Sequence, residues 1–278
     1  MSPVLSQGKV VVLTGAASGI GLHLAKRFLA EQWRLVALDV RYDALQTALG
    51  GMADKQRLML LAMDVRHPAA WDAMLDQVEG HFGVPDVMIN NAGIIVPGRI
   101  QNATPELIDR HIDINLKGVL YSTSLVAARM IRAGVKGHII NVASMAALAP
   151  VPGIGAYSAS KFGVRAYSLV ANQELAEHGI AVTCVCPDLV DTPMLDTQLD
   201  YPEASITFSG PGALSVSRIG AAIFSALKTR PAECIVPAHR GWLAKMASMF
   251  PVLMRPLKRS MEAKGQRRAE QYKRERRG

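Results

Sequence analysis

The stretch that decides the fold reads VVVLTGAASGIGLHLAKRFLA and occupies residues 10–30. Its first four residues are apolar, as in a strand buried on both faces of a parallel sheet. A turn with Gly15, Gly19 and Gly21 follows, and residues 22–30 have a helical pattern. Glycines let the backbone approach a pyrophosphate closely, and the helix start offers free amides and the positive dipole end. The stretch predicts a dinucleotide cradle, although its glycine spacing differs from G-x-G-x-x-G and also suits a purely structural turn.

Apolar, β-branched runs recur along the chain, separated by helical patterns. They lie at residues 9–15, 34–40, 57–65, 86–93, 137–144, 180–187 and 233–237. Continuously apolar strands that alternate with helices predict a parallel sheet covered on both faces, because parallel neighbours need right-handed helical crossovers. We therefore expect an α/β fold of the Rossmann type, a doubly wound parallel sheet of about seven strands, with ligands at the carboxyl ends of the strands.

The chain shows no sign of a second globular domain. It has 278 residues, half of them apolar, and contains no internal repeat or flexible linker. These features predict one domain at residues 1–238, followed by an amphipathic and basic C-terminal extension at residues 239–278. Two helical segments of the domain are long, at residues 104–132 and at residues 155–178 before Gly179, and neither is expected to be interrupted.

The charge of the chain is concentrated at its C-terminal end. The formal net charge is +8, and residues 255–278 hold ten Lys or Arg and three Glu. We therefore expect no nucleic-acid-binding face on the globular body. No apolar run is long enough for a membrane span or a signal peptide, so a cytoplasmic protein is expected. Cys184, Cys186 and Cys234 lie in predicted strands and should pack in the core, and no metal site is expected.

The C-terminal extension combines apolar and basic residues. Its large apolar residues recur at helical spacing and are Trp242, Met246, Met249, Phe250, Leu253 and Leu257. The basic segment 255–277 follows, and Pro251 and Pro256 are expected to interrupt the helix. Two interpretations remain open. One is a peripheral contact with an anionic membrane surface, and the other is a helix that packs in an oligomer ahead of a solvated tail.

The second apolar run leads to Asp39, eighteen residues after Gly21. At about this separation a carboxylate binds the ribose hydroxyls of a dinucleotide, and it repels a 2′-phosphate. Arg41, two residues further on, would favour NADP. Because a fixed carboxylate should outweigh a flexible cation, the sequence predicts a preference for NAD.

Polar residues at the ends of the next strands and helices form a second pattern. Asn90-Asn91-Ala92-Gly93 ends the fourth run, Asn115 lies in the first long helix, and Ser144 ends the fifth run. Tyr157 and Lys161 open the second long helix, one turn apart and thus on one face. The lysine charge should lower the pKa of the tyrosine and make it usable as an acid and a base. The Tyr-x-x-x-Lys pair alone is common on helices, and it gains meaning only from the other residues.

With these motifs together, residues 9–237 resemble a short-chain dehydrogenase/reductase of the single-domain type. The resemblance implies an NAD(P)-dependent oxidoreductase that interconverts a secondary alcohol and a ketone. It also implies a catalytic tetrad of Asn115, Ser144, Tyr157 and Lys161. In this tetrad the tyrosine exchanges the proton, the serine orients the substrate oxygen, and the asparagine holds a water that links the lysine to solvent. A homodimer or homotetramer packed through the two long helices is implied as well.

The resemblance further assigns residues to the cofactor. The residues expected around its pyrophosphate, ribose and adenine are Thr14, Gly15, Ser18, Gly19, Ile20, Gly21, Asp39, Asp64 and Val65. Those expected around its nicotinamide half are Asn91, Ala92, Gly93, Tyr157, Lys161, Pro187, Val190 and Thr192. One position departs from the family, because Asp188 follows Pro187 where the family has glycine. Asp tolerates unusual backbone angles, so the turn can survive, with altered geometry and charge beside the nicotinamide.

The stretches expected to surround the substrate carry no cation. Residues 144–157 contain no charged side chain, and residues 166–217 contain no Lys or Arg. Because an acidic substrate would require a cation, we expect an uncharged, hydrophobic substrate that is steroid-, terpenoid-, retinoid- or lipid-like. The candidate pocket residues, several of which would equally suit the core, are Met145, Ala146, Ala147, Leu148, Ile154, Leu189, Met194 and Leu195.

Two alternatives remain open. An NADPH-dependent 3-ketoacyl reductase of lipid synthesis would carry a basic patch for its acidic carrier, and Asp39 argues against its cofactor. A non-catalytic dinucleotide-sensing protein would be favoured by a missing member of the tetrad, and all four members are present.

Overall fold

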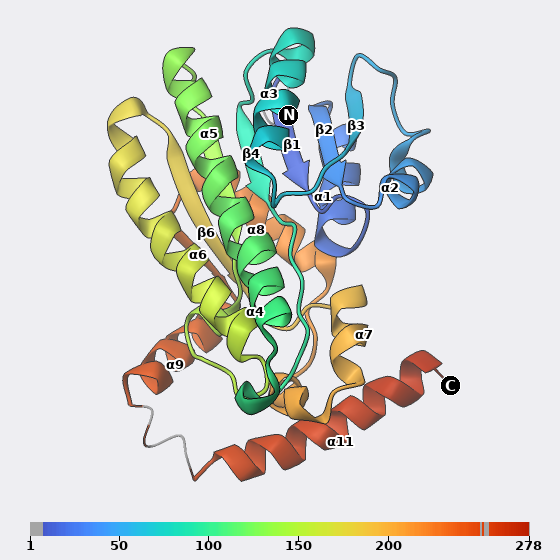
Figure 1. Cartoon of the computed structure of the whole chain (residues 1–278), viewed down its shortest axis with the longest axis vertical. Helices are drawn as coiled ribbons and strands as arrows, with labels where there is room; N and C mark the ends of the chain where they lie inside the picture. Colours follow the sequence, from blue (N-terminus) through green and yellow to red (C-terminus); the bar gives the residue numbers. More distant parts are fainter. Residues whose placement is uncertain (1–7, 251, 253–255, 278) are drawn as a thin grey trace.

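Seven parallel strands form one sheet in the order β3-β2-β1-β4-β5-β6-β7 (Figure 1). The structure is a computed structural model that describes residues 8–250, 252 and 256–277. The strands are β1 (Val10–Thr14), β2 (Arg34–Asp39), β3 (Leu58–Ala62), β4 (Val87–Asn90), β5 (His138–Val142), β6 (Ala181–Pro187) and β7 (Glu233–Val236). Each strand falls within one of the apolar runs, and the Rossmann-type doubly wound α/β fold is confirmed.

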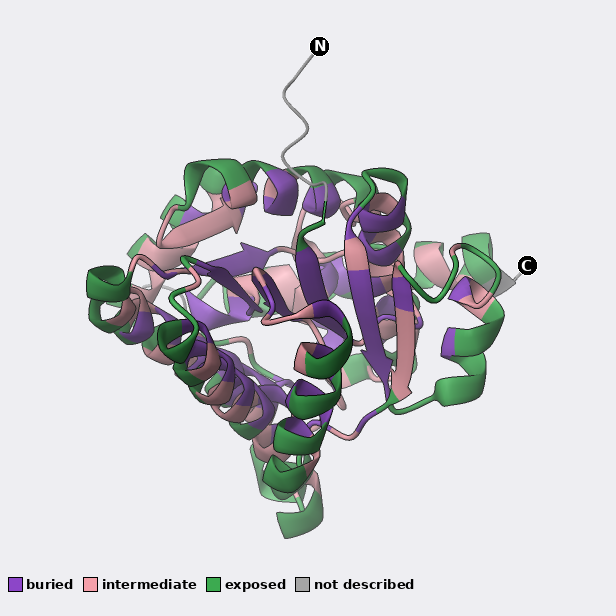
Figure 2. Ribbon diagram, turned by 90° about the horizontal axis from the view of Figure 1, so that it is seen from above, coloured by how far each residue is buried: buried purple, intermediate pink, exposed green. Residues whose placement is uncertain are grey.

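Helices cover both faces of the sheet, as Figures 1 and 2 show. On one face lie α1 (Gly19–Ala30), α2 (Tyr42–Leu49) and α8 (Val216–Thr229), and on the other lie α3 (Pro68–Phe82), α5 (Gly118–Arg132) and α6 (Gly155–Glu174). The remaining helices are α4 (Pro105–Ile112), α7 (Pro193–Leu199), α9 (Ala238–Met249) and α11 (Lys258–Arg277). Short helical turns are η1 (Ile100–Asn102), η2 (Asp113–Lys117), η3 (Met145–Ala147), η4 (Leu175–His178) and η5 (Pro202–Ser209).

The continuous apolar character of β1 follows from its position between these layers. Val11 and Leu13 pack into the core under α1 and α8, whereas Val10 and Val12 pack into the core under α3 and α5. Successive side chains of a strand point to opposite faces, so a strand covered on both faces must be apolar at every position. The two cores thus hold β1 at the centre of the sheet.

The order of strands reverses direction between β1 and β4. From β1 the chain builds outward to β2 and β3, crosses back to β4, and then builds outward to β7. The connections after β1 and after β4 therefore leave on opposite sides, and a crevice opens at the carboxyl ends of these two strands. This crevice is the place in which a doubly wound sheet binds its ligand.

The segment at residues 104–132 is helical throughout but contains one wide turn. It consists of α4, the π-helical turn η2 and α5, and Asn115 lies in the π turn. The segment is therefore unbroken, as expected, and it departs from regular α-helix at this turn. Such single π turns in α-helices often occur at functional sites, because the extra residue changes which side chains face inward. The second long segment is α6 followed by η4, and Gly179 ends it with a φ of 72°.

A buried polar network joins the middle of the sheet to two helices. Asn90 on β4 donates a hydrogen bond to Asn141 on β5 at 2.8 Å and accepts one from Ser122 on α5 at 2.6 Å. Asn141 in turn donates to Ser168 on α6 at 3.0 Å. All four residues are buried. Since each buried polar atom depends on its partner, the network fixes the positions of α5 and α6 relative to the strand ends.

The C-terminal extension packs on the rest of the chain. α9 contacts β7, and α11 lies across η5 and α7 at one end of the molecule (Figure 1). Gly265 of α11 approaches the backbone of Ser205 so closely that a Cβ would collide with its carbonyl oxygen. Neither of the two open interpretations of the extension included this packing. No helix of the described residues is long and apolar enough to cross a membrane. The predictions for Pro251, Leu253 and Arg255 fall outside the described residues.

We expect Asn141→Ala to lower the free energy of unfolding by about 1–3 kcal/mol, because Asn90 and Ser168 would lose buried hydrogen-bond partners. Urea unfolding followed by circular dichroism measures the change. Asn102→Ala, at an exposed position in η1, is the matched control and should change the value by less than about 0.5 kcal/mol. Equal stabilities of the two variants would contradict a structural role of the network.

Candidate active site

One open cavity of about 1060 Å³ lies at the carboxyl ends of the strands. It begins at the turn after β1, passes α6 and ends against α9 and α11. Thr14 and Asp39 line it at one end, Tyr157 and Lys161 in the middle, and Met261 at the other end. The predicted dinucleotide cradle and the predicted catalytic residues therefore share a single cavity.

The glycine turn brings backbone against backbone. Gly15 and Gly19 have positive φ values of 67° and 54°, which other residues rarely adopt. A Cβ on Gly15 would lie 3.0 Å from the Cα of Ala92, and one on Gly21 would collide with the carbonyl oxygen of Gly15. The Ser18 side chain does not cap α1, so it leaves the first amides of the helix free for an anion. The turn fits a dinucleotide pyrophosphate, and Thr14, Gly15, Ser18, Gly19 and Ile20 line the cavity, with Gly21 packed behind them.

Thr14 and Asn91 join the ends of β1 and β4. The Thr14 hydroxyl accepts hydrogen bonds from the backbone amides of Asn91 and Ala92, both at 3.0 Å. The Asn91 side-chain amide donates to the carbonyl oxygens of Thr14 and Gly15, at 3.1 and 3.2 Å. These bonds hold the glycine turn against the loop after β4. Asn91, Ala92 and Gly93 all line the cavity.

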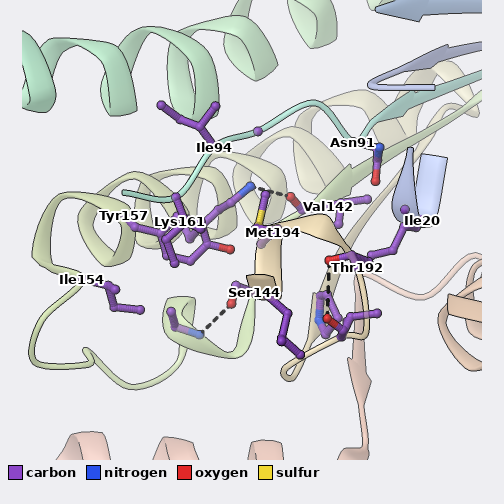
Figure 3. A pocket seen from close by; sticks show the side chains of 18 of the residues that line it. Ile20, Asn91, Ile94, Val142, Ser144, Ile154, Tyr157, Lys161, Thr192 and Met194 are labelled. Atoms are coloured by element: carbon purple, nitrogen blue, oxygen red, sulfur yellow. Dashed lines mark hydrogen bonds between the residues drawn. The ribbon is translucent and has the colours of Figure 1, made fainter. Parts of the chain in front are cut away.

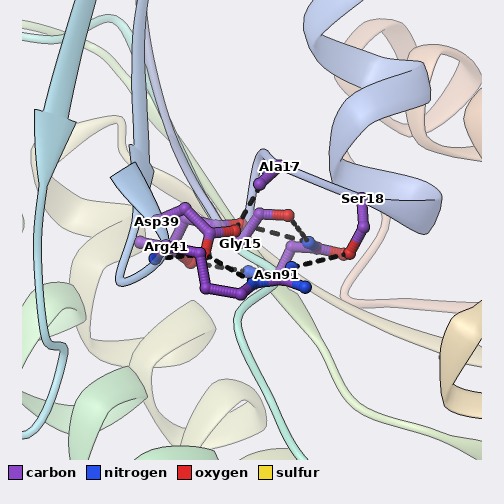
Figure 4. Close-up of polar contacts among 7 residues, drawn as sticks. Gly15, Ala17, Ser18, Asp39, Arg41 and Asn91 are labelled. Carbon is purple, nitrogen blue, oxygen red and sulfur yellow. Dashed lines mark hydrogen bonds and ion pairs between the residues drawn. The ribbon is translucent and has the colours of Figure 1, made fainter. Parts of the chain in front are cut away.

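The carboxylate of Asp39 is buried beside the glycine turn (Figure 4). It accepts hydrogen bonds from the backbone amides of Ala17 and Arg41, both at 3.0 Å. The Arg41 side chain reaches back to Asp39 at 3.4 Å and donates to the Ser18 hydroxyl at 3.0 Å. The predicted ribose-binding acid and its rival cation thus lie side by side. Asp39 is fixed by the backbone, whereas the Arg41 side chain is 58% exposed.

Asp64 and Val65 line the same end of the cavity. The Asp64 carboxylate pairs with Arg66 at 2.6 Å, and this hydrogen bond lowers the pKa of Asp64. Val65 is buried, and its carbonyl oxygen accepts a hydrogen bond from the Trp71 indole at 3.1 Å. Both residues lie where the resemblance implies the adenine.

Asn115 clamps the loop after β4 to α6. Its side-chain oxygen accepts from the amide of Ile94 at 2.8 Å, and its side-chain nitrogen donates to the Ile94 carbonyl at 2.9 Å and to Ser160 at 3.2 Å. A Cβ on Gly93 would lie 3.2 Å from the Asn115 oxygen and 3.5 Å from the Lys161 nitrogen. Both amide hydrogens of Asn115 are therefore bonded within the protein, so a water held by this residue must be bound through oxygen.

Ser144, Tyr157 and Lys161 meet in the middle of the cavity (Figure 3). Ser144 lies just after β5 and caps η3. Its hydroxyl accepts a hydrogen bond from the amide of Ala146 at 3.1 Å. Tyr157 and Lys161 lie one turn apart on α6, with the Lys161 nitrogen 5.7 Å from the centre of the tyrosine ring. That nitrogen donates to the carbonyl oxygen of Val142 at 2.9 Å. Ser144, Tyr157 and Lys161 thus line the cavity together, whereas Asn115 of η2 is buried behind Gly93 and does not line it.

Burial controls the protonation of this pair. Desolvation by burial raises the pKa of Tyr157 to about 12, and a hydrogen bond with Ser144 lowers it only in part. Burial lowers the pKa of Lys161 to about 8. The predicted decrease of the tyrosine pKa by the lysine charge is therefore wrong for the protein alone. Desolvation, which disfavours the charged form of each group, is the largest influence on both pKa values.

The loop after β6 contains the departure from the family pattern. Pro187, Val190 and Thr192 line the cavity as predicted, and the methyl group of Thr192 is the nearest neighbour of Gly19 across it. Asp188 does not need unusual backbone angles, since Gln32 and Arg230 are the non-glycine residues with positive φ in the described part of the chain. Instead, its carboxylate forms an ion pair with Arg240 of α9.

The far end of the cavity is mostly apolar. Met145, Ala146, Ile154, Leu189, Met194 and Leu195 line it, as predicted. Ala147 and Leu148, also predicted for the pocket, pack instead in the core with Val164 and Cys184. Sequence reasoning missed several other apolar lining residues, which are Ile95, Val96, Val151, Ile206, Leu243, Ala244, Ala247 and Met261. Only the helical spacing of the α9 residues offered a signal for any of them.

The prediction of walls without cations is also corrected. Arg110 of α4 and Arg240 of α9 line the cavity, although both lie outside the two stretches that the sequence indicated. Arg240 is neutralised by Asp188, and burial lowers its pKa. Arg110 is exposed. Arg240 therefore lines the cavity as a cation paired with Asp188, and Arg110 lines it as an exposed cation.

The described residues include no group of three His, Cys, Asp or Glu placed to hold a metal ion. Cys184, Cys186 and Cys234 are free thiols, and the first two are buried, 3.7 Å apart between their sulfur atoms. The hydrogen bond with the neighbouring Cys184 thiol and burial raise the pKa of Cys186, so Cys186 contributes packing and no charge.

Known proteins share this fold and much of this sequence. Residues 9–201 match the family described as short chain dehydrogenase. A 3-alpha-(or 20-beta)-hydroxysteroid dehydrogenase of Mycobacterium bovis is 35% identical over 189 residues, which cover 68% of this chain and 72% of that protein. The probable oxidoreductase EphD of Mycobacterium tuberculosis is 34% identical over 189 residues, and the match spans only 32% of its length.

A solved structure gives the same picture. The 3-ketoacyl-(acyl-carrier-protein) reductase of Brucella melitensis, complexed with NADH, is 28% identical with a TM-score of 0.74, over 83% of this chain and 97% of that one. The fold and the matched sequence agree. The chain belongs to the short chain dehydrogenase family.

Proposed function

We propose that this protein is an NAD(H)-dependent oxidoreductase that interconverts a secondary alcohol and a ketone on an uncharged, hydrophobic substrate. The observation that carries the proposal is the meeting of Ser144, Tyr157 and Lys161 in a cavity that continues into the glycine turn. A hydride donor held in that turn and a ketone at the apolar end would approach each other beside the tyrosine hydroxyl. The bound nicotinamide would accept or supply the hydride.

The residues of the chain provide the proton and the orientation. With a pKa of about 12, Tyr157 is protonated at neutral pH and can donate to the oxygen of a ketone as negative charge develops there. Ser144 would hold the same oxygen, and Lys161, with a pKa of about 8, is mainly charged and would stabilise the phenolate that remains. Asn115 would fix the loop that covers Lys161 and hold a water through its oxygen.

The preference for NAD rests on the charge of Asp39. Its carboxylate is buried and held by two backbone amides, so it cannot turn away from a 2′-phosphate. Arg41 could pair with such a phosphate, but its guanidinium is already shared between Asp39 and Ser18. The fixed anion should therefore dominate.

The preference for an uncharged substrate rests on the apolar lining and on Asp188. Arg240 would attract a carboxylate or phosphate, and its ion pair with Asp188 removes that attraction. The remaining contacts at this end come mainly from aliphatic and Met side chains. A steroid-, terpenoid-, retinoid- or lipid-like ketone or alcohol suits such a surface.

A second candidate is a 3-ketoacyl reductase. It is supported by the cationic helix α11 at the substrate end, which would suit an acidic carrier, and by the relative of known structure. The buried Asp39 speaks against an NADPH-dependent enzyme of this kind. A non-catalytic dinucleotide sensor gains no support from a site with all four tetrad residues.

The proposal extends to assembly and location. Homodimers or homotetramers would pack through α5 and α6, which expose Ile131 and Val170. The protein would be cytoplasmic, with a catalytic domain at residues 1–238.

Tyr157→Phe should lower kcat by about 10²- to 10⁴-fold with little change in the affinity for NADH, because only the exchangeable proton is lost. Oxidation of NADH in the presence of a hydrophobic ketone, followed by absorbance, measures the rate. Tyr167→Phe, on the same helix, is the matched control and should keep full activity. If Tyr157→Phe also keeps it, the proposed proton donor is wrong.

Asp39→Asn should raise the ratio of kcat/KM with NADPH to that with NADH by at least about tenfold. The substitution keeps the shape and one acceptor oxygen but removes the charge that repels the 2′-phosphate. Arg41→Ala should change the same ratio in the opposite direction. An unchanged ratio in both variants would show that the two side chains do not select the cofactor.

Asp188→Asn should raise kcat/KM for a ketone with a carboxylate group relative to a matched uncharged ketone, by about tenfold or more. The reason is that Arg240 loses its partner and becomes available to the substrate. The double variant Asp188→Asn/Arg240→Gln should restore the original preference. A wild-type enzyme that already prefers the acidic ketone would refute the uncharged substrate class.

A further inference from the structure

The apolar surface of the protein is concentrated next to the substrate end. Of the fourteen large hydrophobic side chains that are exposed in the described part of the chain, seven lie between residues 242 and 257. We call them the apolar patch, which consists of Trp242, Leu243, Met246, Met249, Phe250, Val252 and Leu257. Trp242 and Met249 are 64% and 68% exposed. Large side chains of this kind cluster on a surface when another apolar phase covers them.

Helix α11 has two different faces. Its inner face packs against η5 and α7 through residues that include Ala269 and Tyr272. Its outer face consists of the exposed cations Lys258, Arg259, Lys264, Arg267 and Arg274, with the acids Glu270 and Glu275 among them. Lys258 lies 3.8 Å from Glu262, whereas the other four cations have no acidic partner among the described residues. The outer face therefore carries a net positive charge toward solvent.

The cationic face is fixed relative to the cavity. Arg276 pairs with Asp191 and Asp196 at one end of α11, and the Tyr272 hydroxyl accepts from the amide of Ala213 at 2.8 Å. Near the other end, Glu262 lies 3.8 Å from Arg99. These contacts at both ends bind the helix across the substrate end and leave its outer face toward solvent.

The apolar patch reaches the cavity through Leu243, and helix α11 reaches it through Met261. Leu243, Ala244 and Ala247 of α9 and Met261 of α11 line it, and Figure 1 shows the two helices at the same end of the molecule. Leu243 is also 58% exposed, so the apolar lining continues to the outside. A substrate could pass from an apolar phase under α9 into the cavity without crossing water.

We propose that the apolar patch and the outer face of α11 dock on an anionic phospholipid bilayer, with the substrate end turned toward it. Cations that face lipid phosphates and Trp, Phe and Met side chains at the acyl boundary are what such a surface binds. Nucleic acid or an acidic carrier protein would match the cations but leave Trp242, Met249 and Phe250 in water. The identity of the delivered substrate rests on the proposed function, whereas the docking itself does not.

The test uses the intrinsic fluorescence of the full chain. It has three tryptophans, and Trp33 and Trp71 are buried, so Trp242 reports contact with lipid. Vesicles of phosphatidylcholine with phosphatidylglycerol should shift the emission to the blue and sediment with the protein. Vesicles of phosphatidylcholine alone should bind at least about tenfold more weakly, since each cation near the surface contributes to the affinity. The shift should be absent in Trp242→Phe.

Two matched sets of variants separate charge from patch. The first set, Arg259→Glu/Arg267→Glu/Arg274→Glu, should weaken vesicle binding at least about tenfold. The control set, Lys26→Glu/Lys55→Glu/Lys228→Glu, changes the net charge equally but on other surfaces. If docking is specific to α11, this control set should bind vesicles nearly as well as the wild type. Met249→Ser/Phe250→Ser should weaken binding, and the exposed Met52→Ser should not.

Several results would overturn the proposal. Two of them concern charge: equal binding to neutral and anionic vesicles, and an equal loss of vesicle binding in the two sets of charge variants. A blue shift that appears without vesicles and grows with protein concentration would indicate self-association instead. Sedimentation with vesicles that an acidic carrier protein abolishes, without any fluorescence shift, would indicate that the cations bind a protein. Oxidation of NADH by a hydrophobic ketone, supplied without vesicles, is measured in parallel. Failure of that reaction with intact vesicle binding contradicts the proposed function alone, and the reverse result contradicts the docking alone.

Discussion

The hydrogen bonds of a single hydroxyl, that of Thr14, join the end of β1 to the loop after β4, where the cavity begins. The order of strands reverses direction between β1 and β4, and the connections after these two strands leave on opposite sides. Thr14 accepts from the amides of Asn91 and Ala92, and its hydroxyl lies 3.4 Å from the carbonyl oxygen of Ile89. This junction holds the glycine turn beside the loop that carries Gly93, and Gly93 lies next to Asn115 and Lys161.

Burial then determines the chemistry within the cavity. A pKa of about 12 for Tyr157 and of about 8 for Lys161 means that the site holds a phenol beside an ammonium at neutral pH. Both shifted pKa values make the free energy of unfolding depend on pH. The depressed lysine pKa destabilises the fold below about pH 8, and this cost fades as the pH rises toward 10.5. The raised tyrosine pKa adds a cost only above about pH 10. The proton-donating state is therefore the resting state of the pair at neutral pH.

The parts of the structure with local causes could be predicted from the sequence. Apolar runs covered on both faces indicated the strands, and glycines at positions 15, 19 and 21 indicated the turn, because a Cβ at any of them meets backbone or side chain. The tetrad positions followed from spacing and resemblance. The direction of the shift in the Tyr157 pKa could not be predicted from the sequence. Spacing along the helix shows that Lys161 is near, but it does not show the burial that raises this pKa. Likewise, nothing local distinguishes Ala147, in the core, from Ala146, in the cavity.

Contacts between distant segments explain the remaining errors. The sequence shows an acidic loop, with Asp188, Asp191 and Asp196, and separately a basic extension. In the structure Arg240 pairs with Asp188, and Arg276 pairs with Asp191 and Asp196. Asp188, which stands where the family has glycine, and Arg240, which pairs with it, thus belong to the same contact between the loop and the extension. The extension is therefore not simply a solvated tail, because its inner cations balance the loop beside the predicted nicotinamide site, and only its outer cations remain for a partner.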